Sequence, residues 1–178
     1  MKNSVYIGVS LDGYIADKNE SLDFLDAIPV PDGEDMGYNS FMNSVDAIIM
    51  GRKSFETICG FDIDWPYQKD VYVLSSTLKS VPSKAEGKAT VVSGTLKDVI
   101  SQVHSNNHKN LYIDGGKTVQ SFLKEDLIDE LIITTIPILV GGGIPLFGDL
   151  ANHLEFECFD TKIFANKIVQ NSFKRVRK

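Results

Sequence analysis

Short apolar runs alternate with segments of mixed polarity along this chain of 178 residues. The runs are rich in β-branched and aromatic residues, which predicts strands, at residues 5–10, 46–50, 71–74, 90–92, 111–113 and 130–137. Segments whose apolar positions recur at helical spacing predict helices, at residues 34–44, 52–59, 96–104 and from Gly116 to Leu123, with Thr95 as an N-cap. Residues 17–33 carry many Asp, Pro and Gly residues and predict a loop with one helical turn.

This order of elements predicts the fold class. Strands that alternate with helices imply an α/β protein of three layers, with a mainly parallel central sheet covered by helices on both faces. Two further strands are predicted at residues 154–162 and 166–176, with no helix between them. Ala165-Asn166 predicts a hairpin there, so the sheet should end in an antiparallel pair. No linker divides the chain, and we expect a single domain over residues 1–178.

Composition and charge narrow the classes of function. No apolar run approaches the roughly 20 residues that span a bilayer, and the N-terminus lacks the features of a signal peptide. Cys59 and Cys158 are far apart and have no metal-ligand spacing, so we expect free thiols, a cytoplasmic protein and no metal site. A net charge of −6 argues against nucleic-acid binding. The basic tail, residues 174–178, is predicted to carry outward charges on a final strand.

Ligands of such sheets bind beyond the carboxyl ends of the strands, and four junctions there have unusual residues. Gly51-Arg52-Lys53-Ser54 follows an apolar strand and opens a helix. Glycine permits close backbone approach, the helix offers free N–H groups, and the cations and hydroxyl complete a possible phosphate site. An ordinary helix start with exposed basic residues would have the same composition.

The other junctions are weaker signals. Ser75-Ser76-Thr77 places three hydroxyls at a strand end, for a phosphate, a ribose or a plain polar turn. Asp114-Gly115-Gly116-Lys117-Thr118 has paired glycines that would let a pyrophosphate lie against the backbone, although turns also use such pairs. Neither this segment nor residues 141–143 fits the G-x-G-x-x-G fingerprint of the Rossmann fold. Residues 10–16, with a turn at Asp12-Gly13, form either a mobile lip over a bound ring or a simple turn.

The order of these motifs is more specific than any one of them. Ser10-Leu-Asp-Gly-Tyr-Ile-Ala, Asp46-Ala-Ile-Ile-Met-Gly-Arg-Lys-Ser-Phe-Glu, Val73-Leu-Ser-Ser and Ile113-Asp-Gly-Gly together resemble the dihydrofolate-reductase-like superfamily. The segment from Asp129 to Phe147 is similar to the branch related to the C-terminal reductase domain of bacterial riboflavin biosynthesis.

The resemblance implies NADPH as cofactor and a homodimer. It places Ile15 and Ala16 beside the nicotinamide. It assigns the phosphates of the cofactor to Gly51, Arg52, Lys53, Ser54, Ser75, Ser76, Gly115, Gly116, Lys117 and Thr118.

The chain also departs from its relatives. Folate reductases carry a Pro-Trp pair after the first loop, whereas this chain has Trp65-Pro66, later and reversed. Asp35 lies at about the right distance before Gly51 to match their carboxylate. The riboflavin enzymes usually have a deaminase domain upstream, with zinc ligands, which this sequence does not contain.

These observations leave several functions open. The leading hypothesis is an NADPH-dependent reductase of a small heterocyclic or carbonyl compound, with 5-amino-6-(5-phosphoribosylamino)uracil as one possible substrate and dihydrofolate as another. An NADP(H)-binding or sensing dimer without turnover is the alternative, and a structural dimer without a ligand is the third. Asp35 is the candidate proton donor, or else a solvated helix-start carboxylate. Asp12, Tyr38 and Trp65 are candidate substrate contacts, or else turn and core residues.

Overall fold

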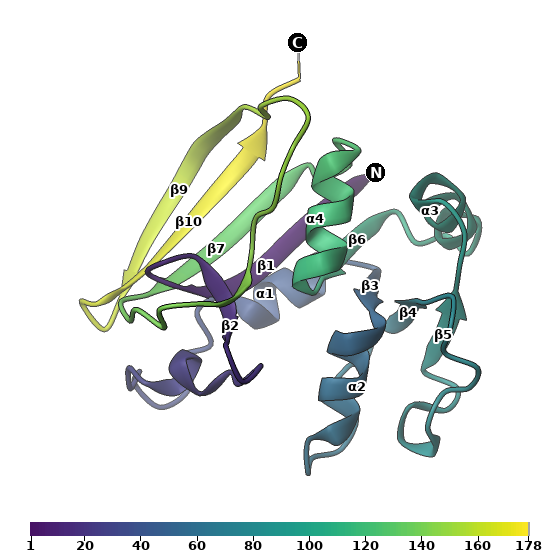
Figure 1. The fold of residues 1–178 in the computed structure, drawn as a ribbon, viewed down its shortest axis with the longest axis horizontal. Coiled ribbons are helices and arrows are strands. Elements are labelled where there is room, and N and C mark those ends of the chain that lie inside the picture. Colours follow the sequence, from purple (N-terminus) through teal and green to yellow (C-terminus); the bar gives the residue numbers. More distant parts are fainter. Residues whose placement is uncertain (178) are drawn as a thin grey trace.

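An eight-stranded sheet runs through the computed structural model, which describes residues 1–177 (Figure 1). Residue 178, the last of the predicted domain and of the basic tail, lies outside the described residues. The strand order is β5-β4-β3-β6-β1-β7-β10-β9. Its members are β1 (Lys2–Ser10), β3 (Ala47–Gly51), β4 (Asp70–Leu74), β5 (Ala89–Val92), β6 (Asn110–Asp114), β7 (Glu130–Ile136), β9 (Phe156–Phe164) and β10 (Ile168–Arg175). All neighbours are parallel except β10, which is antiparallel to both β7 and β9.

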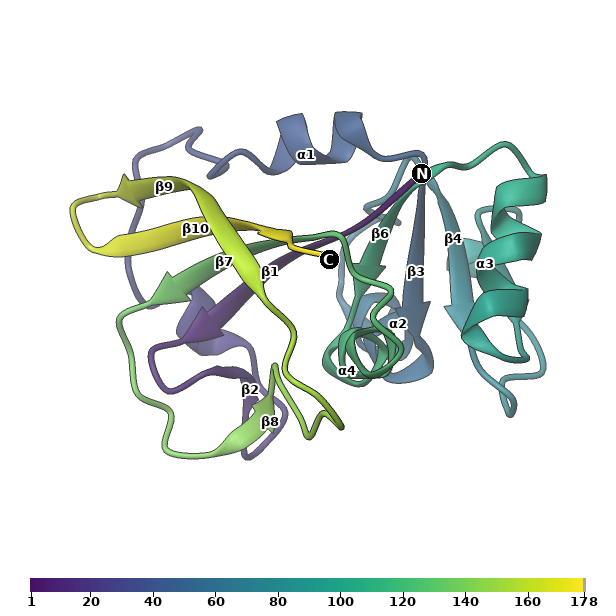
Figure 2. The same ribbon diagram turned by 90° about the horizontal axis from the view of Figure 1, so that it is seen from above.

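Helices cover both faces of the sheet. They are α1 (Tyr38–Ser44), α2 (Arg52–Gly60), α3 (Leu96–Ser105) and α4 (Gly116–Lys124), with short 3-10 turns at η1 (Asp23–Asp26) and η2 (Ser83–Ala85). Apolar residues of α3 and α4 share one buried cluster, and those of α1 and α2 share another. Figure 2 shows α1 on the side of the sheet away from α4. The predicted three-layer α/β fold with an antiparallel C-terminal hairpin is confirmed.

The helix predicted over residues 34–44 begins later, at Tyr38. The carboxylate of Asp35 accepts the backbone N–H groups of Gly37 at 2.8 Å and of Asn39 at 2.9 Å. Gly37 has a φ of 89° and Met36 a φ of 52°, so the chain turns in the left-handed region before the helix starts. Asp35 therefore bonds the backbone at the start of this helix, whose N-cap is Gly37, and Met36 lies outside the helix.

A two-stranded sheet, β2 (Tyr14–Asp17) with β8 (Gly143–Pro145), was not predicted. The turn between β1 and β2 is tied to the segment around β8 by backbone hydrogen bonds from Leu11 to Ile138 at 2.8 Å and from Leu146 to Gly13 at 3.0 Å. Residues 10–16, considered as a mobile lip, are therefore bonded along their length to a segment that lies far away in the sequence.

The C-terminal hairpin turns at Ala165 and Asn166, whose φ values of 50° and 56° are both positive, as the tightest hairpin turns require. The basic tail is held more firmly than predicted. Arg175 forms an ion pair with Asp126 at 2.7 Å, and Arg177 reaches Asp129. No helix within residues 1–177 is long and apolar enough to cross a bilayer.

Candidate functional site

The carboxyl ends of four parallel strands form one edge of the sheet. β4, β3, β6 and β1 are neighbours in that order, and their registers place Gly51 opposite Leu74 and Met50 opposite Asp114. The junctions singled out in the sequence follow these strand ends directly. Parallel pairing therefore gathers the segments 51–54, 75–77 and 114–118 at the same edge.

Two of these segments touch. A Cβ atom added to Gly51 would lie 2.8 Å from Oγ1 of Thr118, and one added to Gly115 would collide with Oγ of Ser54. Gly115 also has a φ of 86°, which side-chain-bearing residues rarely adopt. Both glycines are thus required by close approach: the side chains of Ser54 and Thr118 occupy the space beside them, and Gly115 is buried.

Two helices begin at this contact. Gly51 is the N-cap of α2 and Gly115 is the N-cap of α4, and neither start has a side-chain cap. Each helix has nine residues, so each presents uncapped backbone N–H groups and the positive end of its dipole. This arrangement suits a bound phosphate or pyrophosphate, which accepts hydrogen bonds from such groups.

The cations predicted for the phosphates lie at the rim. Arg52 is exposed and lies 3.7 Å from Glu56 one turn along α2, and Lys53 forms an exposed ion pair with Glu20 at 2.5 Å. Exposed pairs of this kind contribute little to stability. Both cations can therefore exchange these partners for a ligand phosphate at little cost.

The remaining polar candidates differ in exposure and in whether their side chains already form hydrogen bonds. Lys117 is exposed in the first turn of α4. The hydroxyl of Ser75 accepts backbone N–H groups of Thr77 at 3.2 Å and of Leu78 at 3.0 Å, so it shapes the turn. Ser76 is exposed, which leaves its hydroxyl available to a ligand.

The residues predicted beside the nicotinamide lie on the small sheet. A Cβ atom on Gly116 would lie 2.6 Å from Cδ1 of Ile15 and 3.4 Å from Cγ2 of Ile144. Ile15 and Ile144 thus form an apolar wall against the start of α4, while Ala16 is buried behind them. Ile144 was not predicted as a site residue, because its position depends on the pairing of β2 with β8.

Asp12 joins two loops beside this wall. Its carboxylate accepts the hydroxyl of Ser10 at 2.6 Å and the backbone N–H groups of Gly141 at 2.8 Å and Val140 at 3.2 Å. The hydrogen bond from Ser10, followed by those from the backbone, lowers the pKa of Asp12. The group stays ionised and holds the loops together, and its contact with substrate stays a prediction.

A proton donor needs a carboxyl that keeps its proton near neutral pH. The pKa of Asp35 is lowered by hydrogen bonds from the backbone of Asn39 and Gly37, so its environment favours the ionised form. Its role as a proton donor stays a prediction that this geometry does not favour.

Asp114 has the opposite environment. It ends β6, immediately before the glycine pair, and burial raises the pKa of its carboxyl, with hydrogen bonds from Tyr112 and Gly115 partly offsetting that effect. Part of the residue reaches the surface, yet the carboxyl group lies deep enough for burial to dominate. The hydroxyl of Tyr112 lies 3.1 Å from Oδ1 of Asp114 and 2.9 Å from the carbonyl of Tyr6.

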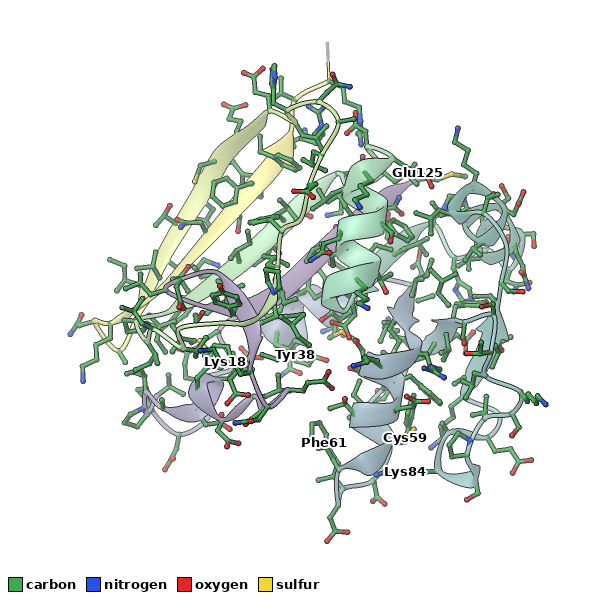
Figure 3. All side chains as sticks on the ribbon, viewed as in Figure 1. Lys18, Tyr38, Cys59, Phe61, Lys84 and Glu125 are labelled. Atoms are coloured by element: carbon green, nitrogen blue, oxygen red, sulfur yellow. The ribbon has the colours of Figure 1, made fainter. Side chains whose placement is uncertain are left out.

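Further tyrosines lie around this carboxyl. Burial first, and then the charge of Asp114, raise the pKa of both Tyr38 and Tyr67. Tyr38 is half-buried and packs edge-on against Tyr6, with 5.7 Å between ring centroids. Tyr38, labelled in Figure 3, is the first residue of α1. Tyr67 and Asp114 were missed as site residues; an acidic residue between a buried strand and a glycine pair was the available signal for Asp114.

Trp65, considered as a stacking residue, is only 9% exposed. Phe55 and Tyr67 pack against its ring at centroid distances of 5.8 and 5.5 Å, both edge to face. The ring belongs to the core on the α2 side of the sheet, and its stacking on a substrate stays a prediction. Within residues 1–177, no three or more His, Cys, Asp or Glu side chains are grouped to hold a metal ion.

The chain matches known proteins both in sequence and in structure. The RibD C-terminal domain family matches residues 4–170. The uncharacterized protein YwjB of Bacillus subtilis is 37% identical over 170 residues, which cover 94% of each chain. A crystal structure from Shewanella sp. PV-4, provisionally assigned to riboflavin biosynthesis, is 46% identical, covers 99% of this chain and 100% of its own, and superposes with a TM-score of 0.96.

A more distant structure shows the same fold. Dihydrofolate reductase from Enterococcus faecalis, solved with NADP(H), superposes with a TM-score of 0.67 at 12% identity, and the match covers 98% of this chain and 96% of the reductase.

Proposed function

This chain belongs to the RibD C-terminal domain family, and from that premise we propose that it is an NADPH-dependent reductase of a small heterocyclic or carbonyl substrate. The observation that carries the proposal is the contact between residues 51–54 and 115–118, where two uncapped helix starts meet at glycines with no room for a side chain. The uncapped N–H groups and the helix dipoles of these two starts support the binding of a pyrophosphate through their charge.

The bound cofactor would supply the hydride. Gly51, Ser54, Gly115 and Thr118 would hold the pyrophosphate through backbone N–H groups and hydroxyls. Arg52 and Ser76, both exposed at the same edge, would favour NADPH over NADH by pairing with its extra phosphate.

The chain's own residues would orient the reacting rings. Ile15 and Ile144 would flank the nicotinamide and exclude water from one side of it. Tyr38 and Tyr67, near Asp114, would offer aromatic surface to a flat substrate ring.

Asp114 is the better candidate for the proton that accompanies the hydride. Its raised pKa favours a carboxyl that keeps its proton at higher pH than an ordinary aspartic acid, and its place at the end of β6 sets it beside the cofactor segment. Reduction of a C=N or C=O bond would take the hydride at carbon and this proton at the heteroatom. The 5-amino-6-(5-phosphoribosylamino)uracil of riboflavin biosynthesis contains a sugar that could be reduced in this way, and dihydrofolate contains such a ring bond.

Loss of NADPH absorbance with a panel of pyrimidine, pterin and carbonyl compounds tests the proposal. Binding at 100 times the dissociation constant should stabilise the fold by roughly 2.7 kcal/mol, measured as a thermal shift. NADPH binding without turnover of any compound would favour the alternative of a non-catalytic sensing module. If Arg52→Ala and Ser76→Ala leave the preference for NADPH over NADH unchanged, the phosphate contacts are misplaced.

We also propose that the protein forms a homodimer. Phe159 and Ile163 on the edge strand β9 are 56% and 65% exposed, and Leu139 and Phe147 nearby in the C-terminal half are 69% and 51% exposed. Large apolar side chains that remain this exposed often mark an interface. Light scattering should give twice the chain mass for the wild type and a smaller mass for Ile163→Asp; an unchanged mass in both proteins would refute the role of this edge.

A further inference from the structure

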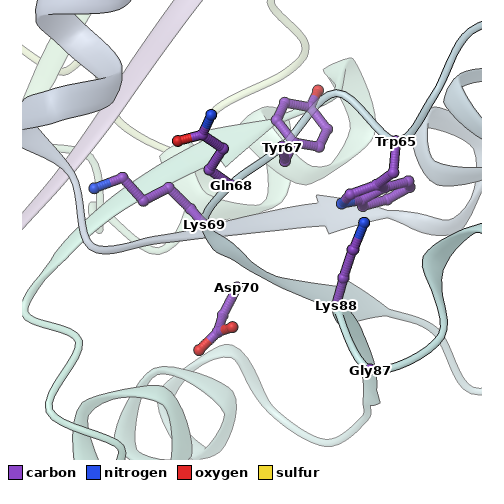
Figure 4. Close-up of a pocket in the computed structure, with 7 residues that line it drawn as sticks. All are labelled: Trp65, Tyr67, Gln68, Lys69, Asp70, Gly87 and Lys88. Carbon is purple, nitrogen blue, oxygen red and sulfur yellow. The ribbon is translucent and has the colours of Figure 1, made fainter.

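A pocket of about 260 Å³ lies beside the starts of β4 and β5 (Figure 4). It is lined by Trp65, Tyr67, Gln68, Lys69, Asp70, Gly87 and Lys88. Asp70 is the first residue of β4, and Lys88 directly precedes β5, so the pocket lies at the amino ends of these strands. The pocket also reaches toward α2, because the ring of Trp65 packs against Phe55 with 5.8 Å between centroids.

The pocket contains a buried donor without an acceptor. Trp65 is 9% exposed, and its Nε1 is buried with no hydrogen-bond partner among the described residues. Folded proteins seldom leave a buried N–H group unpaired, because it has lost its hydrogen bonds to water. An unpaired indole N–H that lines a pocket therefore indicates a place for an acceptor.

A cation approaches the same position. Lys88 is exposed, and no carboxylate of residues 1–177 lies within ion-pair distance of its ammonium group. Figure 4 shows this ammonium directed toward the edge of the indole ring that carries Nε1. Two donors that converge with no acceptor between them match the needs of a negatively charged oxygen.

The other charged groups of the pocket leave this position available. The carboxylate of Asp70 lies 3.1 Å from Nε2 of His108 and points away from Trp65 in Figure 4, as does the ammonium of Lys69. Gly87 has a φ of 72° and no atom within 4 Å of the position of a Cβ, so the wall beside Lys88 is open. The exposed Lys88 side chain can therefore move as a ligand enters.

We propose that this pocket binds the oxyanion of a small molecule, a phosphate or a carboxylate group, between Nε1 of Trp65 and the ammonium of Lys88. One oxygen accepts the indole N–H, and the net negative charge pairs with the lysine. The site shares Tyr67 with the proposed substrate surface but shares no residue with the proposed dinucleotide contacts, and its existence does not depend on the reductase proposal.

Trp65 is the single tryptophan of the chain, so its fluorescence reports on this pocket and on the adjoining side of α2. The full chain is titrated with inorganic phosphate and with acetate, against sodium chloride at equal ionic strength. A saturating change in emission with either oxyanion, absent with chloride, is expected. Saturation with phosphate only, or with acetate only, identifies the class of oxyanion. A change that never saturates, or that chloride reproduces, means an adventitious ion only and overturns the proposal.

Matched variants assign the site. Lys88→Gln should weaken the apparent affinity about tenfold or more, as expected for loss of one charged hydrogen bond. Lys97→Gln, on the surface of α3, removes the same charge outside the pocket and should leave the affinity unchanged. Calorimetry of Trp65→Phe, with circular dichroism to check folding, should show weaker binding. Equal affinity in Lys88→Gln and Lys97→Gln would overturn the assignment.

A last titration distinguishes binding in this pocket from binding in the proposed cofactor site. The phosphate titration is repeated with NADPH at saturation. The affinity for phosphate should not change, whereas competition would place the anion in the dinucleotide site and overturn a separate pocket. Failure of NADPH itself to bind would refute the proposed reductase but would leave the phosphate titration interpretable.

Discussion

Gly115→Ala tests the central contact of the proposed site. Gly115 has a φ of 86° and a ψ of 137°, a backbone conformation that costs alanine about 1–3 kcal/mol. Its Cβ would also collide with Oγ of Ser54, and overpacking of this kind costs about 1–3 kcal/mol. Alanine also restricts the unfolded chain, which stabilises the folded state by about 0.4–1 kcal/mol and offsets part of this cost. We therefore expect the free energy of unfolding to fall by about 2–4 kcal/mol, which lowers Tm by roughly 4–15 °C for a chain of this length.

Gly33→Ala is the matched control. Its φ of 82° is nearly the same, but no atom lies within 4 Å of its Cβ position. The free energy of unfolding of this variant should fall by only about 1 kcal/mol, because the strained backbone is its only cost. Differential scanning fluorimetry gives both shifts, and calorimetry gives the NADPH affinities, which should fall about tenfold or more for Gly115→Ala and stay unchanged for Gly33→Ala.

A double-mutant cycle isolates the contact. Ser54→Ala removes the hydroxyl that a Cβ at position 115 would strike. The double variant should be about 1–3 kcal/mol more stable than the sum of the single effects predicts. Equal destabilisation by Gly115→Ala and Gly33→Ala, or NADPH binding to Gly115→Ala with the affinity of the wild type, would refute the reasoning.

Three further outcomes are expected. Asp114→Asn should lower turnover by about 100-fold or more while NADPH binding persists. Because the pKa of Asp114 is raised in the folded state, its favourable contribution is complete below the ordinary carboxyl pKa and is lost as pH rises through the raised value, so this variant should raise Tm at pH 7 but not at pH 3. Asp12→Ala should speed hydrogen exchange at Val140 and Gly141 and weaken NADPH binding; unchanged exchange would contradict the loop contact. Thr95→Ala breaks a capping box and should cost about 1 kcal/mol, seen in urea titrations, with cofactor affinity as the control that must not move.

The regular elements of the sheet could be predicted because their apolar runs report burial on both faces. The start of α1 could not, since Asp35 and the positive φ of Gly37 delay it by four residues relative to a pattern that fits a helix from residue 34. The pairing of β2 with β8 was also out of reach. It joins segments about 130 residues apart, and a strand of three residues has too short a pattern to recognise.

Part of the candidate site could likewise be predicted from the sequence, and part could not. Residues 51–54 and 115–118 could be expected to meet, because parallel strands carry their junctions to a common edge. The environments of individual carboxyls could not be predicted, because they depend on side chains from several elements. Asp35 is bonded by its own turn, whereas Asp114 is enclosed and bonded to Tyr112, and the local sequence does not give the direction in which either pKa shifts.

The position of β1 has a consequence during synthesis. This strand leaves the ribosome before the other strands of the sheet, yet its neighbours are β6 and β7, which emerge more than 100 residues later. Its apolar side chains therefore stay exposed to solvent, or are shielded by a chaperone, until most of the chain has been synthesised and can pair with it. Sheet formation depends on contacts between distant parts of the sequence, so folding should be slow for a protein of this size, and fragments that end before residue 136 should aggregate rather than fold.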